Sequence, residues 1–258
     1  RPDRHHRSAG PFSFRQVVVV AAMFGCAMGM VAQNLDHPAI GDPPPGAMID
    51  HAFQLSLQRK QARDAPFDRL KRLIHIEGDI GLAERTDRPV MWLVPHFLAL
   101  DVAGAGILLN QTRRAGSIYQ QQSNPVFDRA MRRGRLRFGN AEIFSRRDGS
   151  KPLIRAIRRG DAFFNLPDMD FGMKDSAFVP FFGVPAATLL APSKMARALD
   201  MVVQPVVAEM LPGGRGYVVR FEEPWADFPS DDPVADAARR MLSPRCTESR
   251  MFSTLRAM

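Results

Sequence analysis

From residue 69 onward, short apolar runs alternate with more polar, amphipathic segments along the chain. The apolar runs predict buried strands at 90–95, 116–121, 141–145, 161–167, 201–211 and 216–224. The segments between them predict helices at 98–110, 125–137, 150–159, 192–199 and 233–241. The last two strands are joined by PGGRG, which is typical of a hairpin turn. This alternation favours an α/β fold with a mixed central sheet flanked by helices, in which functional groups gather where strands end.

The two ends of the chain do not continue this pattern. Residues 1–67 are predicted to be an atypical N-terminal appendage, because the breaker NLDHPAIGDPPPG separates most of them from the alternating region. They include an apolar stretch, residues 17–32, which is shorter than the roughly 20 residues of a spanning helix. A spanning segment, an interfacial anchor and a buried helix all remain open for it. Residues 68–242 are predicted to form the folded domain, and residues 243–258 an atypical tail consistent with truncation.

Composition narrows the class of partner. The formal net charge of +8 over 258 residues indicates an acidic partner, and arginine supplies most of the excess. No nucleic-acid motif is present, and two Tyr and two Trp give few stacking platforms, so we expect an anionic membrane surface and an acidic protein rather than nucleic acid. The two cysteines, Cys26 and Cys246, form neither a disulfide framework nor a zinc site, which favours a reduced, cytoplasmic-side protein.

The clearest chemical pattern is His96 followed five positions later by Asp101, where an apolar strand passes into a helix. A carboxylate in the next helical turn can accept a hydrogen bond from one imidazole nitrogen and leave the other free to take a proton. Such a pair can activate a hydroxyl for attack on an acyl carbon. The alternative is a helix-capping histidine with an incidental aspartate. A GxSxG turn is absent from the sequence, which argues against an α/β-hydrolase.

Further blocks accompany this pair in a fixed order. They are SIYQQQSNPVFD at 117–128, IFSRRDG at 143–149 and FFNLPDMDFGMKDSAFVPFFGVPAAT at 163–188. Together with HFLALD, they resemble the late acyltransferases of bacterial lipid A biosynthesis, within the lysophospholipid acyltransferase group. The resemblance covers roughly residues 69–241, so it makes residues 68–242 an acyltransferase domain with a glycerolipid acyltransferase-like fold. Both ends depart from the family, as does Gln120, where many members have an arginine after the tyrosine.

The resemblance implies a mechanism and a place in the cell. His96 would be the general base that deprotonates a hydroxyl of a lipid A precursor, with Asp101 orienting it, and the oxygen would attack an acyl carrier protein thioester. Arg146, or its neighbour Arg147, would stabilise the oxyanion or grip a phosphate. No cofactor and no metal are expected beyond this thioester donor. The protein would work on the cytoplasmic face of the bacterial inner membrane, either peripherally or through a single anchor.

The last block supplies the residues for the acceptor. By resemblance Asp168, Asp170 and Lys174 would help to bind it, although two aspartates beside Gly172 are equally typical of a turn. Two acids one residue apart also allow a metal site, which the absence of a nearby His or Cys pattern disfavours. The apolar run Phe178–Val184 is interpreted as the wall of an acyl tunnel or as ordinary core. Two other functions remain open: acylation of another glycerolipid, and a non-catalytic relative that binds anionic membranes.

Overall fold

The computed structural model describes residues 66–96, 99–168, 175–181 and 184–241. Seven of its strands form one sheet, in the order β1 (Ile74–Gly78), β9 (Tyr217–Phe221), β8 (Val202–Met210), β2 (Val90–Leu93), β5 (Ala162–Asn165), β3 (Ala115–Tyr119) and β4 (Ala141–Ser145). The five strands from β8 to β4 are parallel to one another, whereas β9 pairs antiparallel with β8 and carries β1 parallel to itself. The predicted α/β class with a mixed central sheet is confirmed.

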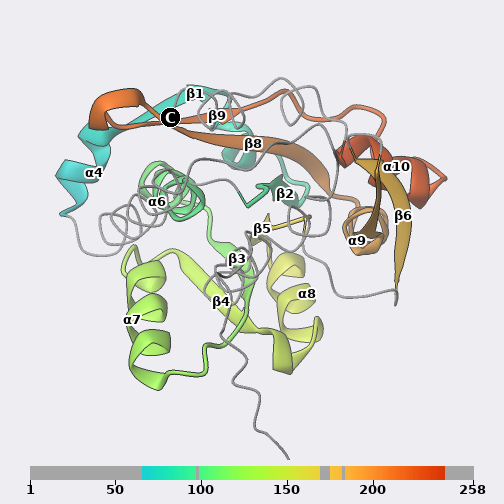
Figure 1. Ribbon diagram of the computed structural model, residues 1–258, viewed down its shortest axis with the longest axis horizontal. Helices are drawn as coiled ribbons and strands as arrows, with labels where there is room; N and C mark the ends of the chain where they lie inside the picture. The colour runs from blue at the N-terminus through green and yellow to red at the C-terminus, as the bar shows by residue number, and fades with distance from the viewer. Residues whose placement is uncertain (1–65, 97–98, 169–174, 182–183, 242–258) are drawn as a thin grey trace, which may run out of the picture.

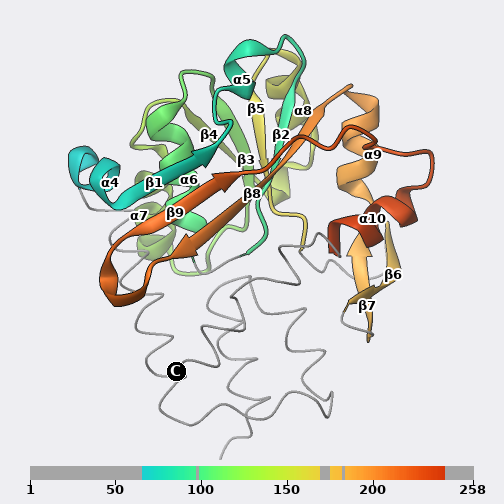
Figure 2. The ribbon, with the colours of Figure 1, turned by 90° about the horizontal axis from the view of Figure 1, so that it is seen from above.

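Helices cover both faces of the sheet, as Figures 1 and 2 show. On one face, α6 (Leu100–Asn110) packs on β8, β9 and β1, and α7 (Pro125–Leu136) lies beside α6 and β4. On the other face, α8 (Lys151–Arg158) and α9 (Ala191–Ala198) pack beneath β2, β3 and β5. The remaining short elements are α4 (Phe67–Leu73), α5 (Leu82–Arg85), η1 (Arg146–Asp148), η2 (Pro212–Gly214) and α10 (Pro233–Met241).

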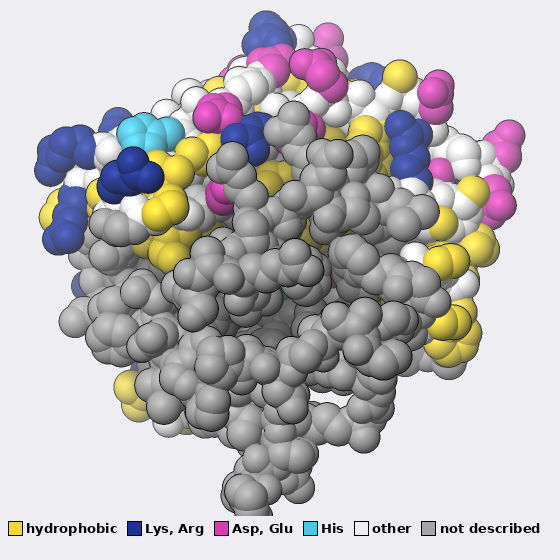
Figure 3. Space-filling view, turned by 45° about the horizontal axis from the view of Figure 1, so that its top comes forward, with side chains coloured by type: hydrophobic (Ala, Val, Ile, Leu, Met, Phe, Trp, Pro, Cys, Tyr) yellow, Lys and Arg dark blue, Asp and Glu magenta, His cyan; other side chains and the backbone are white. Residues whose placement is uncertain are grey.

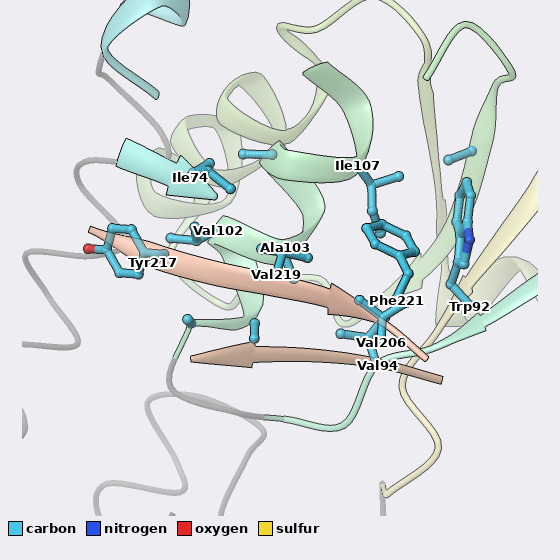
Figure 4. Packing of buried hydrophobic residues seen from close by; sticks show 14 of the residues in the cluster. Ile74, Trp92, Val94, Val102, Ala103, Ile107, Val206, Tyr217, Val219 and Phe221 are labelled. Carbon is cyan, nitrogen blue, oxygen red and sulfur yellow. The ribbon is translucent and has the colours of Figure 1, made fainter. Parts of the chain in front are cut away.

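The two faces divide the core by the two-residue period of a strand. Along β2, Val90 and Trp92 pack into the cluster under α6, whereas Met91 and Leu93 pack into the cluster with α8 and α9. All four side chains are buried, which is why this strand is a continuous apolar run in the sequence. Figure 4 shows the α6 side, where side chains of this helix lie beside the Trp92 ring and side chains from β1, β8 and β9.

A buried amide fixes the register at the centre of the sheet. Gln204 on β8 is fully buried and accepts a hydrogen bond of 3.2 Å from the indole nitrogen of Trp92, its register partner on β2. Its own amide group donates to the backbone carbonyls of Asp79 and Glu222. A buried polar group is tolerated when its hydrogen bonds are satisfied, so this side chain joins β2 and β8 to the connections after β1 and β9.

One element differs from the sequence expectation. The run Phe178–Val184 belongs to a separate antiparallel hairpin of β6 (Ser176–Phe181) and β7 (Val184–Leu189), which lies against α10. Val179 is buried, but the neighbouring Phe178 is 60% exposed, so its side chain is not core. On a two-stranded ribbon with one covered face, alternate side chains must point outward. In Figure 3, hydrophobic side chains gather on the side of the molecule where Figure 1 places β6 and α10, and Lys and Arg side chains gather on the opposite side near α4.

The start of α7 agrees with the pattern read from the sequence. Asn124 caps the helix, accepting hydrogen bonds from the backbone N–H groups of Val126 and Phe127, and Pro125 takes the first helical position. Asp128 is buried and accepts from the backbone N–H of Gln122. These residues therefore fix where the chain turns from β3 into α7.

Glu84 on α5 provides a pH-dependent contribution to stability. Its carboxylate accepts hydrogen bonds from the backbone and hydroxyl of Thr112 and from the backbone of Arg113. The hydrogen bond from Arg113, followed by those from Thr112, holds the pKa of this carboxyl below its ordinary value. A lowered folded-state pKa stabilises the fold above the unfolded pKa of about 4.3, and that stabilisation disappears as the pH falls through the folded value.

We therefore expect Glu84→Gln to lower the free energy of unfolding by about 1 kcal/mol or less at pH 7, since the carboxylate is exposed and partly screened by water. Urea unfolding of both proteins at pH 7, 5 and 4 should show this difference shrinking as the pH falls. Glu223→Gln, which changes an exposed glutamate of the same charge, is the matched control and should leave stability unchanged. An equal loss at every pH would contradict the assignment.

Several features of the sequence lie outside the described residues. They are the apolar stretch 17–32, both cysteines, the N-terminal appendage up to residue 65 and the tail from residue 242. Among the helices that the structure does describe, none combines the length and the apolar character needed to cross a bilayer.

Candidate functional site

The site is built at the ends of two neighbouring parallel strands. In the pairing of β2 with β5, Leu93 is the register partner of Asn165, and Val94 continues the ladder by donating to the carbonyl of Asn165. His96 and Asp168 each follow their member of the register pair Leu93–Asn165 by three residues. Because the two strands run in the same direction, both side chains emerge at the same edge of the sheet.

The imidazole of His96 is held by the carboxylate of Asp168. The ring Nδ1 lies 2.8 Å from Asp168 Oδ1, and the backbone N–H of His96 donates to Asp168 Oδ2 at 2.7 Å. The His96 side chain is 7% exposed and the Asp168 side chain 23%. An aspartate in this position favours the tautomer with its proton on Nδ1, which leaves Nε2 able to accept a proton. The arrangement can therefore act as a general base that is nearly shielded from water.

Asp101 lies in the first turn of α6, as the sequence predicted, and is held by an arginine. Arg135 of α7 donates from Nη2 and Nε to Asp101 Oδ1, at 2.9 and 3.2 Å. Both side chains are about one-third exposed, at 33% for Arg135 and 28% for Asp101. This pair joins α6 to α7. The orienting role that the family resemblance gives to Asp101 stays a prediction.

Arg146 and Arg147 lie in η1, directly after β4, and both side chains are exposed. The carboxyl end of β4 lies at the same edge of the sheet as His96, because β4, β3, β5 and β2 are all parallel. Three strand spacings separate β4 from β2, which is about 14 Å. A long arginine side chain would have to extend toward β2, or a bulky substrate span the gap, for an oxyanion contact to form. That role also stays a prediction.

The remaining predicted site residues, Asp170 and Lys174, lie outside the described residues. Within the part of the chain that the structure describes, no group of three or more His, Cys, Asp or Glu side chains could hold a metal ion.

Two features of the site escaped the sequence analysis. The contact between His96 and Asp168 was missed, although both strands end in the same pattern: Val94-Pro95-His96 and Leu166-Pro167-Asp168. When two buried strands each continue into a proline and then a polar residue, the pattern indicates that the two polar residues can meet at the carboxyl ends of neighbouring parallel strands. Arg135 was missed because it is one of five arginines between 129 and 137, and no spacing rule singles it out.

Comparison with known proteins finds relatives among the lipid acyltransferases. Residues 59–245 match the family described as bacterial lipid A biosynthesis acyltransferase. A lipid A biosynthesis acyltransferase of Haemophilus influenzae is 37% identical over 134 residues, which cover 52% of this chain and 40% of that protein. The lipid A biosynthesis myristoyltransferase of Escherichia coli is 36% identical over 122 residues (47% and 37%), and the lauroyltransferase of the same organism 34% identical over 152 residues (58% and 48%). The chain thus spans about two-fifths of the length of the first two relatives.

Among solved structures, the 1-acyl-sn-glycerophosphate acyltransferase of Thermotoga maritima aligns with 92% of this chain and 94% of its own, with a TM-score of 0.42 and 14% identity.

Proposed function

Because the chain belongs to the bacterial lipid A biosynthesis acyltransferase family, we propose that it transfers a fatty acyl chain from an acyl carrier protein thioester to a hydroxyl of a lipid A precursor. The observation that supports this most directly is the buried His96 held by Asp168 at the carboxyl ends of the parallel strands β2 and β5. A general base is what a hydroxyl acceptor needs, since its oxygen is a poor nucleophile until its proton is removed.

The proposed reaction is a direct transfer. His96 Nε2 takes the proton of the acceptor hydroxyl as the oxygen attacks the thioester carbonyl. The tetrahedral intermediate then collapses, the carbon–sulfur bond breaks, and the carrier thiolate leaves and takes up a proton from His96. The products are an ester on the acceptor and the free thiol of the carrier, so no acyl-enzyme is formed and no cofactor is consumed.

The carboxylates would have distinct roles in this reaction. Asp168 is proposed to orient His96 and to stabilise its ring when it carries the proton, since it is the carboxylate that contacts Nδ1. Asp101 is proposed to hold the helix that follows His96 in place through its pair with Arg135. Arg146 or Arg147 would stabilise the oxyanion, and Asp170 and Lys174 would contact the acceptor, as the family resemblance implies. The reaction would take place at the cytoplasmic face of the inner membrane.

The direct test is acyl transfer by the full chain in detergent micelles, with a labelled acyl carrier protein thioester as donor. A tetra-acylated lipid A precursor and a 1-acylglycerol phosphate are offered as alternative acceptors. We expect label in the lipid A precursor and little in the glycerophosphate. Transfer to the glycerophosphate alone would replace the proposal with acylation of another glycerolipid, and no transfer to either acceptor would contradict catalysis by this chain.

A further inference from the structure

The outward side of α7 exposes apolar side chains where a soluble helix normally has polar ones. Val126 is 65% exposed and Phe127 is 42% exposed, and both lie in the first turn. Among the described residues, they are the only two sequence neighbours in the group of exposed large hydrophobics, which also contains Phe67, Phe178 and Val234. In Figure 1, α7 lies at the periphery of the molecule, with α6 and β4 on its inner side. These two adjacent side chains give the first turn of α7 an apolar tip.

Two exposed arginines lie on the same side of the helix as Val126. Arg129 and Arg133 are exposed and lie three and seven residues after Val126, so they share its face. Within the described residues neither guanidinium has a hydrogen bond or ion pair, whereas Arg132 donates to Tyr119 and Arg135 to Asp101. The face therefore has strong positive charge with no acidic partner from the described chain.

Along α7, the two apolar side chains lie nearer to the His96 end of the sheet than the two arginines do. The helix starts after the carboxyl end of β3, which is parallel to β5 and β2, so Val126 and Phe127 lie toward the sheet edge that carries His96. At 1.5 Å per residue, Arg129 and Arg133 lie roughly 5 and 10 Å farther along the axis. Moving away from that edge, the face therefore passes from apolar side chains to cations.

We propose that the outer end of α7, with Val126 and Phe127 in its first turn and Arg129 and Arg133 farther along the side of Val126, docks the protein on an anionic lipid bilayer, with the carboxyl ends of β2 and β5 turned toward the membrane. The two apolar side chains would enter the boundary between headgroups and acyl chains, and the two guanidinium groups would contact lipid phosphates. Along α7, apolar side chains come first and cations follow, just as acyl chains are followed by phosphates from the interior of a bilayer to its surface. A protein partner would instead be expected to meet an apolar centre ringed by polar groups. This inference rests on the proposed function in one respect: the acceptor of the proposed reaction is a lipid.

The first test is sedimentation of the full chain with vesicles, without substrate. Each membrane-proximal cation contributes about 1 kcal/mol, so Arg129→Gln/Arg133→Gln should weaken partitioning onto phosphatidylglycerol-containing vesicles by roughly 30-fold. Arg155→Gln/Arg158→Gln removes the same charge from exposed positions of α8 and should have little effect. Because every variant is the same full chain, contributions from other segments cancel in the ratio. Equal weakening by both pairs would reduce the effect to net charge and overturn the proposal.

The second test reports where α7 lies and does not depend on the total affinity. Phe127→Trp places an indole at the apolar tip, and the parent protein, with its own Trp92 and Trp225, provides the background signal. Anionic vesicles that contain brominated lipid should quench the added fluorescence. Vesicles of neutral phosphatidylcholine with the same content of brominated lipid should quench it less. An unquenched indole would overturn the proposal. If the α7 arginine pair instead weakens binding to acyl carrier protein and leaves vesicle binding intact, the surface belongs to the carrier.

Both tests are separate from the acyl-transfer assay. Vesicle binding through α7 with no acyl transfer would contradict the proposed function and leave the docking surface standing. Acyl transfer in micelles without vesicle binding through α7 would contradict the docking surface and leave the proposed function standing.

Discussion

Replacing His96 with alanine is expected to reduce acyl transfer to the lipid A precursor by roughly 100- to 10,000-fold, the usual contribution of a positioned general base. The imidazole is buried against Asp168 at the carboxyl ends of β2 and β5. The measurement is initial rate with saturating labelled acyl carrier protein thioester. Added imidazole should restore part of the rate, because the cavity left by the ring lies beside an intact carboxylate.

The matched control is His75→Ala, which removes an exposed histidine of β1. It should leave the rate unchanged, and thermal unfolding should show that both variants remain folded. Full activity in His96→Ala would eliminate His96 as the base and with it the proposed mechanism.

The second large effect is expected for Asp168→Asn, which should lower kcat by roughly 100- to 10,000-fold with little change in KM. The carboxylate accepts from both the backbone N–H and the ring Nδ1 of His96, whereas an amide has only one acceptor atom. If that oxygen keeps the backbone bond, the amide NH₂ faces Nδ1. The ring must then carry its proton on Nε2, which is the tautomer unable to accept the proton of the acceptor.

A double-mutant comparison separates this positioning role from a general loss of structure. If Asp168 acts through His96, the double variant His96→Ala/Asp168→Asn should be no slower than His96→Ala alone. Asp101→Asn should be tested in the same way, because the family resemblance gives Asp101 the role of orienting His96. If its effect disappears in the His96→Ala background while that of Asp168→Asn persists, Asp101 is the orienting carboxylate and the assignment to Asp168 is wrong.

The apolar pattern of the sequence predicts some strands of this fold and misses others. The apolar runs predicted the core strands β2, β5, β8 and β9 within a few residues, because a strand that is covered on both faces is mostly apolar along its whole length. The hairpin of β6 and β7 was missed because its Phe-rich sequence has the same composition as core, and composition does not reveal whether a second face is covered. Phe178 therefore looked internal and is mostly exposed.

The sequence by itself determined that His96 and Asp168 each come after a buried strand, and that Asp101 begins the helix after His96. Only the tertiary structure decided which carboxylate the histidine contacts. Residues 96 and 168 are 72 positions apart, and they meet because β2 lies beside β5 with Leu93 opposite Asn165. That neighbour relation depends on the order in which all seven strands assemble, for which no local pattern carries a signal. Likewise Arg135 became recognisable only when α7 packed against α6 and brought one arginine of a basic run to Asp101.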